Sequence, residues 1–256
     1  MPPKKPIPTV SIVIATYARL DRLQRCIDKV RQNVGISHET IVVGGAGGDG
    51  TAAWAAQQPD LIFIHETRRE GATRAYNKGF RAATGTFVMW LNDDSYPLPG
   101  AVEAAVEMIE TAAPGDIGMV AFYHNYARTW NRLDSVQHEG QTYSIYNVRG
   151  VPYANFGLLR RDLLERLGYL DDRYYFCGWD PDLSLKVQRE AGLKVVGCPK
   201  ALIYHEELLD DRKQEDLAIV DRDNAALFAK WRLPARFSYP DPAPAYKEMM
   251  RQRMSV

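Results

Sequence analysis

The sequence is poor in cysteine and has no net charge. Its three cysteines, Cys26, Cys177 and Cys198, lie far apart and form no C-x-x-C pair. This excludes the common zinc and disulfide-exchange motifs, and we expect reduced thiols in a cytoplasmic protein. The 32 basic residues are balanced by 32 acidic ones, which argues against binding of nucleic acid through an excess of positive charge. We therefore expect no nucleic-acid partner.

Long apolar runs are also missing. No stretch approaches the roughly 18 apolar residues that span a bilayer, and the basic start of the chain is not followed by the apolar segment of a signal peptide. The tail 234–256 mixes basic and aromatic residues, so the sequence leaves open whether it contacts the inner face of a membrane, a second subunit or the body of the protein. With 256 residues, 46% of them hydrophobic, the chain is long enough for one large α/β domain or two small lobes.

Apolar segments of two kinds alternate along the first ninety residues. Short β-branched runs predict buried strands, and apolar residues at helical spacing predict amphipathic helices. The strands are expected at residues 9–16, 40–43, 61–65 and 87–91, and the helices near 20–30, 51–57 and 72–83. This alternation is typical of βαβ units and a parallel sheet.

The regular alternation of predicted strands and helices ends after residue 92. Further helices are predicted near 101–111, 161–167 and 181–191, further strands near 117–122 and 201–204, and an aromatic, polar segment through residue 153 is expected to enclose a ligand or to pack as ordinary surface. We expect one continuous domain made of an extended leader (1–8), two lobes (9–99 and 100–205) and a helical tail (206–256).

Two adjacent carboxylates follow a buried strand. Asp93 and Asp94 come directly after the strand predicted at 87–91. In open α/β sheets ligands bind beyond the carboxyl ends of the strands, and one or two carboxylates together with substrate phosphates are the usual ligands of Mg²⁺. The alternative is a turn or a helix N-cap, where Asp is also favoured.

Two further positions could carry chemistry. Asp180 precedes Pro181, which is typical of a helix N-cap, but a carboxylate there could also face a cleft and act as a general base. Its neighbour Trp179 could stack on a sugar or belong to the core. His205 ends an apolar strand, where it could bind a metal or make an ordinary hydrogen bond.

Taken in order, these segments resemble glycosyltransferase family 2 of the bacterial surface-glycan type, whose members are inverting enzymes of the GT-A fold. The likeness spans residues 9–231. Its motifs are Val10-Ser11-Ile12-Val13-Ile14-Ala15-Thr16-Tyr17-Ala18-Arg19, Gly71-x-x-x-Ala75-x-Asn77-x-Gly79, Asn92-Asp93-Asp94, Gly157-Leu158-Leu159-Arg160-Arg161, Asp180-x-Asp182-Leu183-Ser184-Leu185, Pro199-x-Ala201, His205 and Asn224-x-x-Leu227-Phe228-x-x-Trp231. It implies a Rossmann-like, mostly parallel central sheet flanked by helices, with a nucleotide-sugar lobe (9–99), a smaller acceptor-side lobe (100–205) and a helical C-terminal tail.

The resemblance also implies how a donor would be held. Tyr17 would stack on the nucleobase beside the backbone of Ala15, and Asp93 would contact the ribose or the water shell of the metal. Asp94 and His205 would coordinate Mn²⁺ or Mg²⁺. Arg69 and Arg74 would contact the diphosphate, unless they belong to a solvated helix face.

The resemblance implies the reaction as well. Asp180 would be the catalytic base and Trp179 would contact the acceptor. The expected activity is metal-dependent, inverting hexosyl transfer from a UDP, dTDP or GDP sugar to a hydroxyl of a glycan or lipid-linked acceptor in polysaccharide synthesis. A retaining double displacement would need an additional nucleophile, which the sequence does not identify.

Two departures from the family pattern keep an alternative open. No acidic residue stands at Gly44 or Gly45, where the family commonly has one, and Asn92 takes the first place of the Asp-x-Asp motif. A non-catalytic GT-A-like module that binds nucleotide or glycan would fit these departures. A dinucleotide site is disfavoured because the glycine-rich segment 44–50 matches G-x-G-x-x-G poorly and follows the second strand. A sugar nucleotidyltransferase is disfavoured because residues 15–19 lack glycine.

Overall fold

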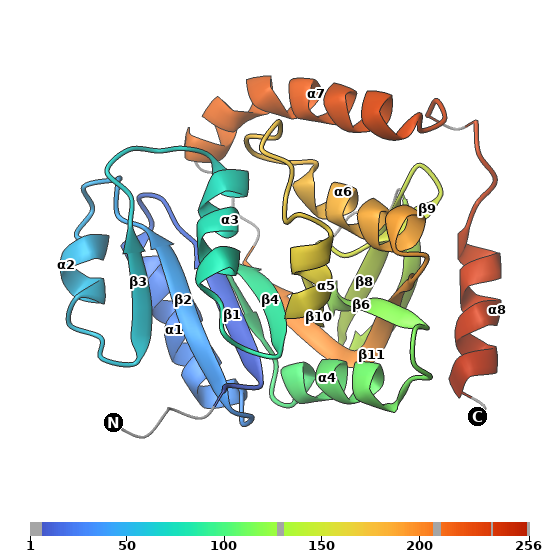
Figure 1. The fold of residues 1–256 in the computed structure, drawn as a ribbon, viewed down its shortest axis with the longest axis horizontal. Coiled ribbons are helices and arrows are strands. Elements are labelled where there is room, and N and C mark those ends of the chain that lie inside the picture. Colours follow the sequence, from blue (N-terminus) through green and yellow to red (C-terminus); the bar gives the residue numbers. More distant parts are fainter. Residues whose placement is uncertain (1–6, 127–130, 207–210, 237, 255–256) are drawn as a thin grey trace.

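A single eleven-stranded sheet forms the centre of the molecule, and helices cover it (Figure 1). The structure is a computed structural model that describes residues 7–126, 131–206, 211–236 and 238–254. The main path of the sheet has the strand order β3-β2-β1-β4-β10-β6-β11-β5.

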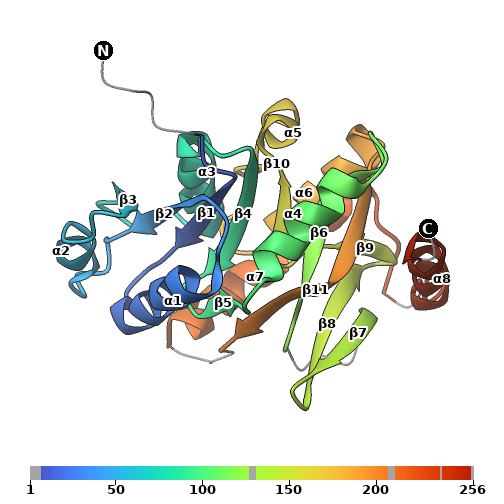
Figure 2. The same ribbon diagram turned by 90° about the horizontal axis from the view of Figure 1, so that it is seen from below.

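The amino-terminal half of the sheet is parallel. Its strands are β1 (Val10–Ala15), β2 (His38–Gly44), β3 (Leu61–His65) and β4 (Phe87–Asn92). The connecting helices are α1 (Leu20–Asn33), α2 (Thr51–Ala55) and α3 (Ala72–Ala82). Figure 2 shows α1 and α3 on opposite sides of these strands. The predicted alternation of strands and helices is confirmed.

The central strands β1 and β4 are buried because both of their faces are covered. From Val10 to Ile14 and from Phe87 to Leu91 the side chains are buried without exception. Gly79 of α3 allows the helix to approach closely, since a Cβ there would lie 2.2 Å from Cγ1 of Val13. This packing holds the carboxyl ends of β1 and β4 side by side, with Ala15 opposite Asn92.

Beyond β4 the sheet is mixed. The helices here are α4 (Ala101–Thr111), α5 (Arg161–Arg166) and α6 (Trp179–Leu185), the last continued by the π-helix Lys186–Glu190. The strands are β5 (Ser95–Pro97), β6 (Ile117–His124), β10 (Gly157–Arg160) and β11 (Lys194–His205). Strand β10 runs antiparallel between β4 and β6, and β5 runs antiparallel to β11.

The aromatic, polar segment that ends at residue 153 forms regular secondary structure. It forms the antiparallel strands β7 (Arg132–His138), β8 (Gln141–Val148) and β9 (Val151–Tyr153). The pairs Glu139-Gly140 and Arg149-Gly150 make the two-residue turns, with positive φ at all four residues as type I′ hairpins require. Trp130, one of the aromatic residues of this segment, lies outside the described residues.

Two predicted boundaries were wrong. Helix α6 starts at Trp179 with Gly178 as its N-cap, so Asp180 lies inside the first turn and is not the cap. Strand β11 starts at Lys194 and continues past Pro199, because a register shift between Cys198 and Leu202 accommodates the proline that the sequence pattern marked as a break.

The carboxyl-terminal tail is helical, as predicted. It consists of α7 (Asp211–Trp231) and α8 (Ala243–Met254). The apolar side of α8 packs on the body: Tyr246 and Met250 are each 5% exposed, and the Tyr246 hydroxyl accepts a hydrogen bond from the Gly197 N–H at 2.6 Å. Over the described ranges, no helix combines the length and apolar character that a membrane crossing requires.

Candidate functional site

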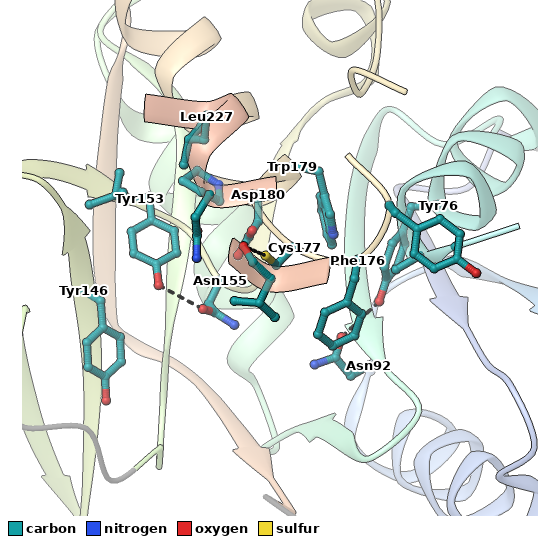
Figure 3. A pocket seen from close by; sticks show the side chains of 18 of the residues that line it. Tyr76, Asn92, Tyr146, Tyr153, Asn155, Phe176, Cys177, Trp179, Asp180 and Leu227 are labelled. Carbon is teal, nitrogen blue, oxygen red and sulfur yellow. Dashed lines mark hydrogen bonds between the residues drawn. The ribbon is translucent and has the colours of Figure 1, made fainter. Parts of the chain in front are cut away.

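A cleft of about 860 Å³ lies beyond the carboxyl ends of β1 and β4. One wall is formed by those strand ends and the start of α3, the other by β8, β9 and the second half of α7. The loop before α6 and the first turn of that helix lie between the two walls, and Figure 3 shows Asp180 there, between Tyr153 and Asn155 on one side and Tyr76 and Asn92 on the other.

The two carboxylates after β4 line this cleft and are almost fully buried. Asp93 accepts a hydrogen bond from the Thr16 hydroxyl at 2.9 Å. The guanidinium of Arg19, which is 5% exposed, places Nη1 2.7 Å from Asp94 Oδ2 and 3.2 Å from Asp93 Oδ1. A buried pair of like charges is costly without such compensation. Arg19, which the sequence analysis did not single out, therefore holds both carboxylates in place.

A buried tyrosine supports the same turn. The Tyr76 hydroxyl donates to the Leu91 carbonyl at 2.8 Å and lies 3.1 Å from Asn92 Oδ1. Burial raises the pKa of Tyr76 well above its usual value, and the charges of Asp93 and Asp94 raise it further. The hydroxyl therefore stays protonated and remains a hydrogen-bond donor to the strand end.

The structure brings His205 to Asp94 across the sheet. Ser95 follows Asp94 directly and pairs with His205 in the β5–β11 register. As a result, His205 Nε2 lies 3.1 Å from Asp94 Oδ1, while the buried His205 Nδ1 has no hydrogen-bond partner among the described residues.

The spacing of this pair fits a divalent cation. Two ligand atoms at right angles around an ion with bonds of about 2.1 Å lie about 3.0 Å apart, close to the separation of His205 Nε2 and Asp94 Oδ1. Within the described ranges, no cluster of three or more His, Cys, Asp and Glu side chains gathers at one point. A bound ion would thus take two ligands from these residues and the rest from water and phosphate oxygens, as Mg²⁺ commonly does.

The predicted base lies on the first turn of α6. Asp180 lines the cleft, and its carbonyl accepts a hydrogen bond from the Ser184 hydroxyl at 2.9 Å. Its neighbour Trp179 also lines the cleft but is only 6% exposed, because its ring packs 4.6 Å from that of Tyr76 and 5.6 Å from that of Trp90. Trp179 thus packs in the core and also borders the cleft. Its contact with an acceptor stays a prediction.

Four of the five donor-side residues predicted from the sequence reach the cleft, Asp93 among them. Ala15, Tyr17 and Arg69 line it, and the Arg69 guanidinium lies 4.8 Å from the centroid of the Tyr17 ring. Arg74 does not line it: its side chain is exposed on α3 and contacts the Glu70 carbonyl at 3.5 Å. Its position therefore matches a solvated helix face.

Close packing and backbone conformation favour glycine at position 44, the last residue of β2, and at position 45. A Cβ at Gly44 would lie 2.4 Å from the Thr16 carbonyl oxygen, and Gly45 adopts a φ of +100°. An acidic residue could not stand at Gly44 without moving the end of β1. Glu66, which follows β3 and was not singled out from the sequence, lines the cleft instead and pairs with Lys78 at 2.7 Å.

A third residue that the sequence analysis did not single out anchors the loop before α6. Asp223 of α7 is fully buried, and its Oδ2 accepts the backbone N–H groups of Tyr175, Phe176 and Cys177 at 3.0, 2.8 and 3.2 Å. Nothing in the sequence pattern pairs residues this far apart. Helix α7 thereby fixes the segment that leads into Asp180.

Comparisons with known proteins show the family and the fold of the chain. A family model described as "Glycosyl transferase family 2" matches residues 11–168. The uncharacterized glycosyltransferase YwdF of Bacillus subtilis (strain 168) is 27% identical over 212 residues, covering 81% of this chain and 78% of that protein. The succinoglycan biosynthesis protein ExoO of Rhizobium meliloti (strain 1021) is 30% identical over 110 residues, which are 41% of this chain and 31% of that protein.

The fold has solved relatives. The structure of the mannosyltransferase PcManGT from Pyrobaculum calidifontis, in complex with GDP-Man and Mn²⁺, superposes with a TM-score of 0.58 at 19% identity. The superposition covers 99% of this chain and 85% of that one. The GT-A architecture expected from the sequence is confirmed.

Proposed function

Because the chain belongs to glycosyl transferase family 2, we propose that it transfers a sugar from a nucleoside-diphosphate sugar to a hydroxyl of a glycan acceptor, with inversion and with the help of Mn²⁺ or Mg²⁺. The observation that carries the proposal is that one cleft contains both the Asp94–His205 pair and Asp180. The first can hold a cation beside a diphosphate, and the second can take a proton from an attacking hydroxyl.

In the proposed reaction, the acceptor oxygen attacks the anomeric carbon as the bond from that carbon to the phosphate oxygen breaks. Asp180 accepts the hydroxyl proton, and the nucleoside diphosphate leaves with the electron pair of the broken bond. A divalent cation, when bound by Asp94 and His205, supplies positive charge for the departing diphosphate. One base and one attack from the opposite face invert the anomeric configuration.

The donor would lie against the wall formed by β1, β4 and α3. Tyr17, backed by the Arg69 guanidinium, would offer a ring face to the nucleobase, and Asp93, which lines the same cleft, would contact the ribose. Glu66 offers a carboxylate to the N–H groups of the base in place of the acid missing at Gly44. The complex of PcManGT with GDP-Man and Mn²⁺ supports this type of donor and cation.

The acceptor class rests on the relatives. ExoO is named for succinoglycan biosynthesis, which supports a bacterial polysaccharide or other surface-glycan intermediate as the acceptor of this chain. The non-catalytic alternative was motivated by the missing acid after β2. The close contact of Gly44 with Thr16 offers a steric reason for that absence and weakens the alternative.

The first test is donor binding followed by donor turnover. UDP, dTDP, GDP and CMP are added with Mn²⁺ or with EDTA, and the expected result is a metal-dependent rise in melting temperature with one nucleoside diphosphate. Sugar donors carrying that base should then release nucleoside diphosphate slowly in the presence of the metal. A module that only binds would release none.

Two variants test the assigned roles. Asp180→Asn is expected to lower transfer at least about 100-fold while donor still binds. Asp94→Ala should weaken binding of donor and metal together. Asp162→Asn, on the exposed surface of α5, is the matched control. Near-normal transfer by Asp180→Asn would remove this residue from the role of base.

A further inference from the structure

The wall of the cleft opposite the Asp93–Asp94 turn carries a positive charge that the reaction described above does not use. This wall includes the β8–β9 hairpin, and Arg149 occupies the first place of its turn. Figure 3 shows Tyr146 of β8 and Tyr153 of β9 on the side of Asp180 away from Asn92. The turn between these strands therefore belongs to the part of the cleft that an acceptor would enter.

Arg149 is held in a defined position. The φ angles of +51° at Arg149 and +89° at Gly150 make a tight turn, closed by a hydrogen bond from the Gly150 N–H to Asn147 Oδ1 at 3.0 Å. The guanidinium carbon lies 4.4 Å from the centroid of the Phe228 ring on α7. A guanidinium stacked on an aromatic face keeps its edge available for hydrogen bonds.

One nitrogen of this guanidinium has no hydrogen-bond partner in the part of the chain that the structure describes. Nη1 of Arg149 is buried and forms no hydrogen bond with any described residue, and no described carboxylate makes an ion pair with Arg149. Burying an N–H group of a charged side chain without a partner costs free energy, so such groups in native proteins generally meet a ligand or water. Arg236 of the segment after α7 lines the same cleft and adds a second positive charge.

A hydrogen-bond acceptor lies on the same wall. Asn131 donates from Nδ2 to the Asn147 carbonyl, and Asn147 donates from Nδ2 to the Asn131 carbonyl, each at 2.8 Å. This reciprocal pair fixes the Asn131 amide beside Asn147, which precedes Arg149 by two residues. Asn131 Oδ1 is buried, lines the cleft and has no hydrogen-bond partner among the described residues.

We propose that Arg149 binds an anionic group of the acceptor, a carboxylate or a phosphate, while Asn131 Oδ1 accepts a hydrogen bond from a neighbouring hydroxyl. This inference rests on the proposed glycosyl transfer and names its acceptor class: an acidic glycan. A guanidinium forms paired hydrogen bonds with either anion, and a half-buried site screens the charge less than open solvent does. Neutral glycans would leave the Arg149 edge unpaired.

The test compares matched acidic and neutral probes. 4-Nitrophenyl β-glucuronide is paired with 4-nitrophenyl β-glucoside for the carboxylate source, and glucose 6-phosphate with glucose for the phosphate source. Binding of each probe to the enzyme loaded with Mn²⁺ and the nucleoside diphosphate is measured by calorimetry. We expect one acidic probe to bind at least about tenfold more tightly than its neutral partner, and the preferred probe identifies the source of the anion.

Three variants make the result specific. Arg149→Gln should abolish the preference for the acidic probe, Arg149→Lys should keep part of it, and Arg166→Gln on exposed α5 should leave it unchanged. The melting temperature should stay near wild type in all three variants, and metal-dependent hydrolysis of the donor should stay near wild type in Arg166→Gln. Equal binding of acidic and neutral probes, or a preference that survives in Arg149→Gln, would overturn the inference.

Donor hydrolysis separates the two levels of the argument. If the wild type binds the acidic probe through Arg149 but never hydrolyses a sugar nucleotide, the proposed transferase activity fails and the anion site stands. If hydrolysis proceeds and no probe preference exists, the anion site fails and the transferase proposal stands.

Discussion

His205 Nε2 lies 3.1 Å from Asp94 Oδ1, although the two residues are 111 positions apart in the sequence. This contact joins the end of β11 to the turn after β4, and it forms because β5 pairs with β11 directly beside that turn. It brings together a nitrogen and an oxygen atom that would bind the cation of the proposed reaction.

The first prediction concerns metal affinity. His205→Ala should weaken binding of Mn²⁺ in the presence of the nucleoside diphosphate at least about tenfold, because one of two protein ligands is lost. Electron paramagnetic resonance of free Mn²⁺ measures this without turnover. His138→Ala, at an exposed position of β7, serves as the control. Unchanged affinity in His205→Ala would exclude the histidine as a ligand.

The second prediction concerns Arg19. Arg19→Gln leaves the buried carboxylates Asp93 and Asp94 without their shared cation, so the free energy of unfolding should fall by about 3 kcal/mol or more. Added Mn²⁺ should recover more stability in this variant than in the wild type, because it replaces the missing positive charge.

Denaturant unfolding with and without Mn²⁺ measures both effects. Arg25→Gln removes an exposed partner of Glu206 and should leave stability near wild type. Equal stability of Arg19→Gln and Arg25→Gln would contradict the idea that Arg19 compensates a buried charge pair.

The third prediction assigns Asp223 a positioning role. Asp223→Asn should loosen the backbone at residues 175–177, because an amide replaces a carboxylate that accepts three N–H groups. Since this segment leads into Asp180, kcat should fall about tenfold or more while the KM for donor stays close to wild type. A proportional change in kcat and in the amount of folded protein would show that Asp223 supports stability alone.

The fourth prediction concerns acid stability. Burial raises the pKa of Asp171, but hydrogen bonds from the ammonium of Lys230 and the N–H groups of Arg173 together outweigh burial and lower the pKa from 3.8 to about 2. Because the folded value is below the unfolded one, ionised Asp171 stabilises the fold above about pH 4, and this contribution declines as the pH falls toward 2. Unfolding curves from pH 5 to 2 should show a shallower loss of stability in Asp171→Asn than in the wild type.

Local pattern accounts for much of the fold. The βαβ order of the first half follows from apolar periodicity, which depends on neighbouring residues only, and the strand 61–65 and the helix 101–111 have the bounds predicted for them. The hairpins of β7, β8 and β9 were missed because their exposed faces are polar. The pairs Glu139-Gly140 and Arg149-Gly150 were the available signal for their turns.

The sequence likewise predicts some features of the candidate site, and only the tertiary structure shows the others. The sequence by itself determined the family, the strand endings that carry Asp93 and Asp94, and the presence of Asp180 and His205 as candidates, because these residues stand at recognisable points of local pattern. Only the tertiary structure decided that His205 meets Asp94, that Arg19 contacts both carboxylates of the Asp93–Asp94 turn, that Asp223 anchors the loop before α6 and that Arg149 lines the cleft. The physical reason is that these contacts depend on sheet register and helix packing between residues far apart in the chain, which no local pattern specifies.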